Sequence, residues 1–318
     1  MTNEYRHTPV LLAECLEQSH LKPQHTFVDC TLGGAGHSSE FAARLDDRGI
    51  LIGIDQDQMA LEAAGSRIAA MSSEHGPRVE LLRGNFGNLD DLLLKAQVPG
   101  VDVFLFDLGV SSPQLDLPSR GFSFKEDSPL DMRMDPGTQT ITAAELVNTL
   151  TAAELTRIIR DYSDEKWASR IAQFIVDARA RGPITTSGQL VEIIKDAIPA
   201  SARRAGGHPA KRTFQALRIE VNSELAVLRR GLEAAVRWLN PKGRILVISY
   251  HSLEDKVVKE VFSKYSQTCT CPPDLPVCVC GANPLLKTGR KPILPTLEEV
   301  ERNTRSRSAK LRVAEKIR

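Results

Sequence analysis

The stretch DCTLGGAGH, residues 29–37, stands between an apolar run that begins at Thr26 and a helical pattern. Glycines placed where a strand turns into a helix let the backbone approach a ligand closely and leave the first helical amides open towards it. A second apolar run, residues 50–54, is followed by Asp55, whose carboxylate can accept hydrogen bonds from both hydroxyls of a ribose. The stretch therefore predicts a nucleotide-type cofactor site in an open α/β fold.

The first hundred residues alternate short apolar runs with helical patterns. We expect strands over residues 26–32, 50–54, 79–82 and 101–106, and helices over residues 38–45, 57–71 and 88–96. Such alternation is typical of a parallel sheet with helices on its faces. A later apolar run, residues 244–249, fits the same sheet. The period-two alternation of residues 309–314 predicts a half-exposed antiparallel strand.

The middle of the chain lacks convincing strands. Residues 113–134 have an irregular pattern rich in Ser, Pro and Gly, and helices follow. Capping boxes at Thr142–Glu145 and Thr151–Glu154 open two of these helices. Further helices are expected over residues 164–181, 187–197 and 213–238. We interpret the chain as one α/β domain, residues 1–112 and 212–318, interrupted by an all-helical insertion, residues 113–211.

Bulk composition is that of a folded globular protein. Of 318 residues, 42% are hydrophobic and 25% are charged. No run approaches the roughly 18 apolar residues that a membrane-spanning helix needs. The first residues lack a basic region followed by an apolar core, so we expect no signal peptide and a cytoplasmic location.

Basic residues gather in two places, although the formal net charge is only +1. Residues 203–218 contain five Lys or Arg and no acid, and residues 301–318 contain seven Lys or Arg against two Glu. Local basic patches of this kind can bind a polyanion. A solvated charged face is an equally good interpretation of either run.

NAD and S-adenosylmethionine both fit a glycine turn followed by an acid at a strand end. The dinucleotide pattern requires a further glycine three residues after Gly36, where this chain has Ser39. Phe86 follows the third strand, where an aromatic ring can stack on adenine, with a core position as the alternative for this residue alone. Asp107 follows the fourth strand at the sheet edge where ligands of open α/β folds bind. This series of strand ends favours S-adenosylmethionine, and an NAD-dependent oxidoreductase is the alternative.

Blocks along nearly the whole chain match a known family in order and spacing. They are HxPVLL (7–12), DxTLGGAGHS (29–38), LIGIDxD (51–57), DLGVSSPQLD (107–116), RGFSF (120–124), PLDMRMD (129–135), HPAxRTFQALR (208–218), VISxHSLED (247–255) and RSRSAKLR (305–312). On these residues the chain resembles the bacterial small-subunit (16S) ribosomal RNA cytidine-N4 methyltransferases, the RsmH or MraW family. Tyr250 departs from the pattern, since many members have Phe there, and many relatives lack a cysteine-rich loop at residues 269–280.

The resemblance implies a Rossmann-like class I methyltransferase sheet with a helical insertion and S-adenosylmethionine as cofactor. It implies methyl transfer to the exocyclic N4 amine of one cytidine in the decoding region of the small-subunit RNA. Carried onto matching positions, the family's cofactor contacts fall on Ala35, Gly36, His37, Asp55, Phe86, Asp107 and Gln114.

Two residues are candidates for the chemistry of transfer. The lone pair of a cytosine amine is delocalised into the ring, so acceptors that orient its hydrogens help most in the transition state. We expect Asp107 to be such an acceptor, with binding of the cofactor's methionine ammonium as the alternative. His251 is a candidate contact to the base, with bracing of its loop as the alternative.

The basic runs and an irregular segment supply candidate RNA contacts. Phosphates are expected at Arg203, Arg204, Lys211, Arg212, Arg305, Arg307 and Lys310. Phe122 and Phe124 are candidates for holding a base that has left its stack, and packing of the insertion is an equal alternative. The expected partner is small-subunit RNA within the small ribosomal subunit or a late assembly particle, and no membrane. A homodimer and a non-catalytic RNA-binding assembly factor are left open.

Four cysteines lie in one short loop: Cys269, Cys271, Cys278 and Cys280. Four thiolates can hold zinc in a tetrahedron. Because Cys-x-Cys spacing is less usual in zinc sites than Cys-x-x-Cys, a loop without metal is the favoured interpretation.

Overall fold

Two units make up the chain, and the computed structural model describes residues 9–70, 75–110, 117–124, 126–203, 207–267, 271–272, 275–276, 279–280 and 283–318. Unit 1 consists of Met1–Gly109 and Leu225–Arg318, and unit 2 consists of Val110–Glu224. The second boundary falls after Glu224 and not after residue 211, because Phe214 and Leu217 are buried in the hydrophobic core of unit 2.

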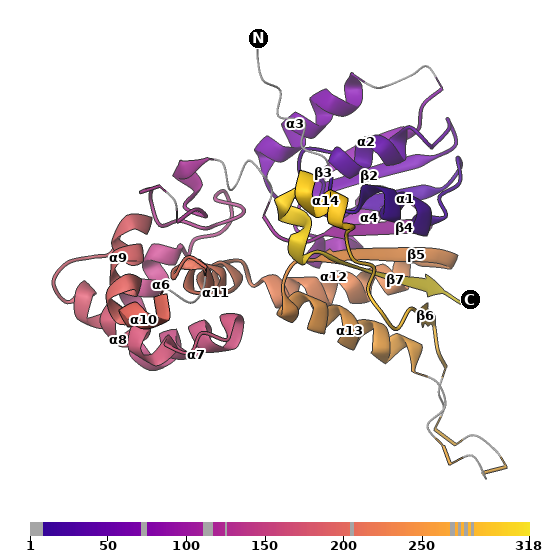
Figure 1. Cartoon of the computed structure of the whole chain (residues 1–318). Helices are drawn as coiled ribbons and strands as arrows, with labels where there is room; N and C mark the ends of the chain where they lie inside the picture. The colour runs from indigo at the N-terminus through magenta and orange to yellow at the C-terminus, as the bar shows by residue number, and fades with distance from the viewer. Residues whose placement is uncertain are drawn as a thin grey trace. The chain divides into compact units, whose positions relative to one another are not determined.

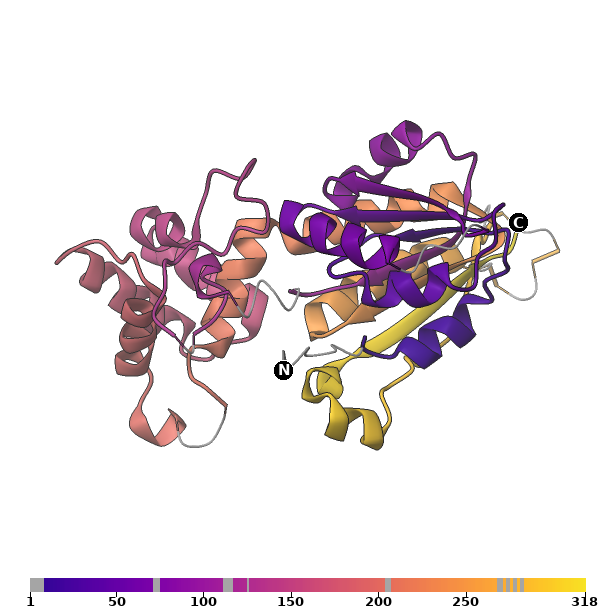
Figure 2. The ribbon, with the colours of Figure 1, turned by 90° about the horizontal axis from the view of Figure 1, so that it is seen from above.

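A mixed sheet forms the centre of unit 1. Its strands are β1 (Thr26–Asp29), β2 (Ile50–Asp55), β3 (Arg78–Arg83), β4 (Val101–Asp107), β5 (Leu239–Ser249), β6 (Leu286–Thr288) and β7 (Lys310–Lys316). Their order in the described residues is β3-β2-β1-β4-β5-β7-β6, and Figure 2 shows them side by side. Strands β1 to β5 pair in parallel, whereas β7 pairs antiparallel with β5 and β6. The predicted parallel sheet with an antiparallel strand near the C-terminus is confirmed.

Helices cover both faces of this sheet (Figure 1). They are α1 (Leu12–Ser19), α2 (Gly36–Ala42), α3 (Gln58–Ala69), α4 (Leu89–Lys95), α12 (Glu224–Trp238), α13 (Ser252–Ser266) and α14 (Leu297–Arg302), with 3-10 turns η1 (Phe86–Asn88) and η3 (Thr304–Ser308). Successive residues of β4 point to opposite faces, so Phe104 and Phe106 pack with α4, α12 and α13. Val103 and Leu105 pack with α1, α2 and α3 on the other face. Burial on both faces explains the uninterrupted apolar run of residues 103–106 in β4.

The single helix predicted over residues 213–238 is wrong. The chain forms α11 (Lys211–Asn222) and α12, and Ser223 between them has left-handed backbone angles, φ 50 and ψ 36. A left-handed residue after a helix ends its hydrogen-bond ladder. The sequence hides this break, because the apolar periodicity continues across a serine instead of a glycine.

Helices dominate unit 2. They are α6 (Ala143–Thr149), α7 (Ala152–Ser163), α8 (Ala168–Arg179), α9 (Ser187–Ala197), α10 (Ala200–Arg203) and α11, with the 3-10 turn η2 (Pro118–Arg120). Both predicted capping boxes are confirmed, since the Thr142 and Thr151 hydroxyls accept hydrogen bonds from the Glu145 and Glu154 amides, and the glutamates reciprocate. Leu155, Ile159 and Ile171 lie in the core that these helices enclose.

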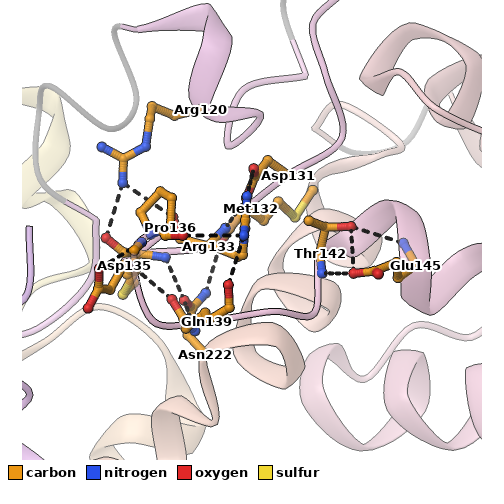
Figure 3. A network of polar contacts seen from close by, with 12 residues as sticks. Arg120, Asp131, Met132, Arg133, Asp135, Pro136, Gln139, Thr142, Glu145 and Asn222 are labelled. Atoms are coloured by element: carbon orange, nitrogen blue, oxygen red, sulfur yellow. Dashed lines mark hydrogen bonds and ion pairs between the residues drawn. The ribbon is translucent and has the colours of Figure 1, made fainter.

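Side-chain hydrogen bonds hold the irregular segment before α6 (Figure 3). Asn222 at the end of α11 donates to the Met132 carbonyl (2.9 Å) and accepts from the Met134 amide (2.8 Å). It also accepts from Gln139 at 3.1 Å. The Asn222 side chain is only 7% exposed, so these bonds replace the backbone pairing that a strand would provide. Residues 126–134 form no helix or strand, as predicted, and the hydrogen bonds of Asn222 hold Met132 and Met134 in place.

No helix in the described ranges is long and apolar enough to cross a membrane.

Candidate active site

Three carboxylates stand at the same edge of the sheet, at the ends of β1, β2 and β4. Asp29, Asp55 and Asp107 are the last residues of strands that neighbour one another in the order β2-β1-β4. Parallel strands bring their carboxyl ends together, which is why residues far apart in sequence meet here. Asp29 has a structural role. Its buried carboxylate accepts hydrogen bonds from the Ser38 hydroxyl at 2.6 Å and from the Thr31 amide at 3.1 Å.

Asp55 ties the end of β2 to the glycine turn. Its Oδ2 accepts from the Gly33 amide at 2.8 Å, and its Oδ1 accepts from the Asp57 amide at 2.9 Å. Burial raises the pKa of the Asp55 carboxyl above its ordinary value, while the amide donors oppose that shift. The carboxylate is therefore fixed in position and has free acceptor capacity at a strand end.

The glycine turn combines one open position with one crowded position. Gly33 and Ala35 have left-handed backbones, φ 49 and φ 57. A Cβ added at Gly34 would meet nothing within 4 Å, whereas one at Gly36 would lie 2.8 Å from Cγ of Pro9. Ala35 precedes α2 without any side-chain cap for its first amides. The turn thus presents open space and backbone donors, which suit close approach of a ligand.

His37 links the residues before α1 to Asp107. Its buried ring places Nε2 3.0 Å from the Val10 carbonyl. A carbonyl oxygen can only accept, so Nε2 carries the proton of the neutral ring. Nδ1 lies 3.6 Å from Oδ2 of Asp107, and burial lowers the pKa of the His37 imidazole. Next to Val10, the Leu11 amide donates to Glu299 of α14 at 2.8 Å.

Asp107 is the most perturbed acid of this edge. Its backbone amide donates to the Thr31 hydroxyl at 2.7 Å, and its Oδ1 accepts from the Tyr250 hydroxyl at 2.7 Å. The side chain keeps 26% of its surface exposed. Burial of the carboxylate raises the pKa of Asp107 to about 7, against the stabilising hydrogen bond from Tyr250. A carboxyl group that titrates near neutrality at a strand end is a strong candidate for a functional group.

Phe86 and His251 have structural partners in unit 1. The Phe86 ring meets Phe106 edge-on at 5.5 Å between centroids, and it is half-buried. His251 precedes α13, where its Nδ1 accepts from the Glu254 amide at 3.4 Å and Glu254 caps the His251 amide at 3.1 Å. These reciprocal hydrogen bonds brace the loop before α13, which is the alternative role that the sequence analysis gave for His251.

The candidate RNA contacts divide between the two units. Arg203, Lys211 and Arg212 are exposed in unit 2, where Arg212 lies 3.6 Å from Glu165. In unit 1, Arg305 and Arg307 are exposed on η3, and Lys310 is half-buried at the start of β7.

The two aromatic candidates for holding a base both have packing partners in unit 2. Phe122 is 6% exposed within the core, and Phe124 stacks on His208 at 4.5 Å between ring centroids. Packing therefore accounts for the position of both rings. Gln114, Arg204, Cys269 and Cys278 lie outside the described residues. The cofactor contact at Gln114 stays a prediction, and so does the interpretation of the cysteine-rich stretch as a loop without metal.

Sequence reasoning missed Tyr250, Glu254 and Glu299 as members of this region. The first two lie in the block VISYHSLED at residues 247–255, where a buried strand runs into a helix, and this position was a signal that could have found them. Glu299 and Leu11 are 288 residues apart in the sequence, and no local pattern predicts a contact between such distant residues.

Known proteins are similar to this chain over nearly its whole length. The chain matches the model of the MraW methylase family over residues 4–317. It is 54% identical over 314 residues to the ribosomal RNA small subunit methyltransferase H of Symbiobacterium thermophilum, covering 98% of this chain and 97% of that protein. The enzyme of the same name from Clostridioides difficile is 52% identical over 315 residues, covering 99% of this chain and 100% of the relative. Among solved structures, a putative rRNA methylase from Clostridium thermocellum has a TM-score of 0.46 at 12% identity, covering 98% of this chain and 100% of that one.

The match to the methylase family and the two curated relatives leave the oxidoreductase and the non-catalytic alternatives without support. The cofactor is S-adenosylmethionine, and the fold is the class I methyltransferase sheet. The chain belongs to the MraW methylase family.

Proposed function

We propose that this chain transfers a methyl group from S-adenosylmethionine to the exocyclic N4 amine of a cytidine in the decoding region of small-subunit ribosomal RNA. The observation that carries the proposal is the Asp107 side chain, partly exposed at the end of β4 near the glycine turn, in a chain of a methylase family. The relatives named above are ribosomal RNA small subunit methyltransferases by name. The specific cytidine and the N4 atom rest on the resemblance of the sequence blocks.

The residues at the sheet edge fit the cofactor. The carboxylate of Asp55 suits the two ribose hydroxyls, and the open space beside Gly34 allows the ligand to approach the backbone. The half-buried Phe86 ring lies beyond β3, where an adenine is expected. We assign cofactor binding to Ala35, Gly36, His37, Asp55 and Phe86, with Gln114 as a further expected contact, and keep binding of the cofactor's methionine ammonium as the alternative role of Asp107.

Asp107 supplies the chemistry that a cytosine amine needs. The bound sulfonium provides an electrophilic methyl group. The Asp107 carboxylate, charged above about pH 7, accepts a hydrogen bond from the amine, holds it for in-line attack and favours a pyramidal nitrogen. We assign His251 to bracing its loop, because its Nδ1 is engaged by the Glu254 amide.

The variant Asp107→Asn separates this role from cofactor binding. Asparagine keeps the size of the side chain and loses the charge. We expect methyl transfer to fall by about 10²-fold or more, while the dissociation constant for S-adenosylmethionine, measured by calorimetry, changes less than about threefold. An equal loss of affinity and turnover would show that Asp107 mainly binds the methionine ammonium of the cofactor.

The RNA contacts are proposed on charge and exposure. Arg203, Lys211, Arg212, Arg305 and Arg307 are exposed and can reach phosphates; Arg204 and Lys310 complete the proposed set. Phe122 and Phe124 are left out of the base-binding set because their rings are packed within unit 2. We further propose that the substrate is the small ribosomal subunit or a late assembly particle in the cytoplasm, and that unit 2 contributes to its recognition.

A further inference from the structure

Tyr250 is held by contacts at both ends of the residue. Its backbone amide donates to Oε2 of the buried Glu254 at 2.7 Å. Its ring runs alongside the Gly109 backbone, where an added Cβ would lie 3.4 Å from the ring. Its hydroxyl donates to Oδ1 of Asp107 at 2.7 Å. The Glu254 carboxylate holds the backbone of Tyr250, the Gly109 backbone lies against its ring, and the phenol is thereby aimed at the Asp107 carboxylate.

We propose that Tyr250 is a positioning residue for methyl transfer, whose hydroxyl keeps the Asp107 carboxylate in one orientation and in its charged form. The proposal rests on the proposed function, because it assumes that Asp107 acts as an acceptor. With Oδ1 occupied by the phenol, Oδ2 is the oxygen that faces His37 at 3.6 Å and that has capacity for a substrate amine. A hydrogen bond to an ionised acceptor is stronger than one between neutral groups.

Other ionisable groups face Asp107 from every element packed around it, and their effects have known signs. Glu254 of α13 raises the pKa of Asp107 by repulsion, and Asp29 of β1 is a second acid at the same edge. Burial raises the pKa of the Cys15 thiol on α1, so this group adds no negative charge near neutrality. Burial lowers the pKa of His37 on α2, so its imidazole adds no positive charge there. The Tyr250 hydroxyl thus opposes burial and Glu254.

Tyr250 itself does not titrate in the working range. Burial and the neighbouring Asp107 raise the pKa of the phenol well above its ordinary value. The hydroxyl is a donor at every pH at which Asp107 changes charge. Without this donor, nothing from Tyr250 opposes the effect of desolvation on the Asp107 carboxyl. The pKa of Asp107 must therefore rise.

The variant Tyr250→Phe removes only the hydroxyl, and Tyr265→Phe is a matched control in unit 1. Tyr265 is half-buried against the core of the same unit. The titration of Asp107 is followed by ¹³C NMR of protein labelled at aspartate carboxyl carbons, with Asp107→Asn to assign the signal. We expect the midpoint to rise by about one to two pH units in Tyr250→Phe and to stay in place in Tyr265→Phe.

The pH profile of methyl transfer provides the second readout. In Tyr250→Phe, the acidic limb moves to higher pH by the same amount as the carboxyl titration, and the rate at pH 9 approaches that of the unmodified protein. Coincident carboxyl titrations in Tyr250→Phe and the unmodified protein would overturn the proposal, even if the variant were less stable or less active. Absence of methyl transfer by the unmodified protein at all pH values would refute the proposed function instead, and the NMR comparison would still decide the role of Tyr250.

Discussion

Asp107 shows how a functional residue is held in surroundings that disfavour its charge. Its pKa of about 7 lies well above the ordinary 3.8 because the carboxylate is withdrawn from water. The Asp107 carboxyl therefore binds its proton more tightly in the folded chain than in the unfolded chain. The stabilising contribution of the group is complete below about pH 4 and is lost as the pH rises through 7.

The same Asp107→Asn variant should accordingly be more stable than the unmodified protein at alkaline pH. A difference of about three pH units in pKa corresponds to at most about 4 kcal/mol at pH 8. The gain should shrink towards zero near pH 4, where both side chains are neutral. Urea unfolding of the two proteins at pH 4, 6 and 8 measures it, and a difference that does not depend on pH would contradict the assigned pKa.

At the level of single residues, the sequence predicts the positions of the acids at strand ends better than the side chains that hydrogen-bond to them. Asp55 and Asp107 follow apolar runs, and adjacent parallel strands must bring such residues to one edge. Tyr250 follows β5, more than a hundred residues later in the chain, and its contact with Asp107 depends on the neighbour order β4-β5. That order is a property of the assembled sheet and is absent from any local pattern.

The glycine turn and α2 form the element that defines the cofactor side of the site. Gly34 faces open space, whereas Gly36 faces the ring of Pro9. Two glycines two residues apart thus have different reasons to lack a side chain. The first leaves room for a ligand, and the second allows the segment before α1 to pack against α2.

The variants Gly34→Ala and Gly36→Ala should therefore fail in different ways. The free energy of unfolding of Gly34→Ala should lie within about 0.5 kcal/mol of that of the unmodified protein. The variant should bind S-adenosylmethionine about tenfold more weakly. Gly36→Ala should lose about 1–3 kcal/mol of stability, because its Cβ would overlap Pro9. Denaturant unfolding and calorimetric titration separate the two effects. Normal cofactor affinity in Gly34→Ala would contradict the proposed approach of the ligand to this turn.

At the level of elements, the apolar runs of β1, β2, β3 and β4 were sufficient to predict those strands. The break between α11 and α12 was not predictable, because Ser223 adopts left-handed angles without being glycine. The irregular segment before α6 was predicted as irregular, but its order was not, since that order depends on Asn222 far along the chain.

At the scale of the whole molecule, positive charge is distributed over both units. Arg305 and Arg307 stand on η3 of unit 1, and Arg203, Lys211 and Arg212 stand in unit 2. A long polyanion suits such a distribution better than a small ligand, because each bound phosphate adds a similar, salt-dependent increment of affinity. The sequence was sufficient to locate both runs, because each is a local excess of Lys and Arg over acidic residues.

The double variant Arg305→Ala, Arg307→Ala should weaken binding to unmethylated small-subunit RNA and flatten its salt dependence. We expect the slope of log affinity against log salt concentration to fall by about 0.7 for each phosphate that the variant no longer binds. The control is Arg44→Ala, Arg48→Ala, which removes two exposed arginines that pair with Glu40 and Asp46. Equal slopes in the two double variants would remove η3 from the RNA-binding surface.

Nucleoside analysis shows which atom of the RNA receives the methyl group. Small subunits that lack this methylation are incubated with the protein and S-adenosylmethionine labelled at its methyl group, and their RNA is digested and analysed by mass spectrometry. We expect label in N4-methylcytidine from a single position of the decoding region, and loss of this label with Asp107→Asn. Label in another nucleoside, at C5 or a ring nitrogen of cytidine, or in no nucleoside at all would refute the proposed function.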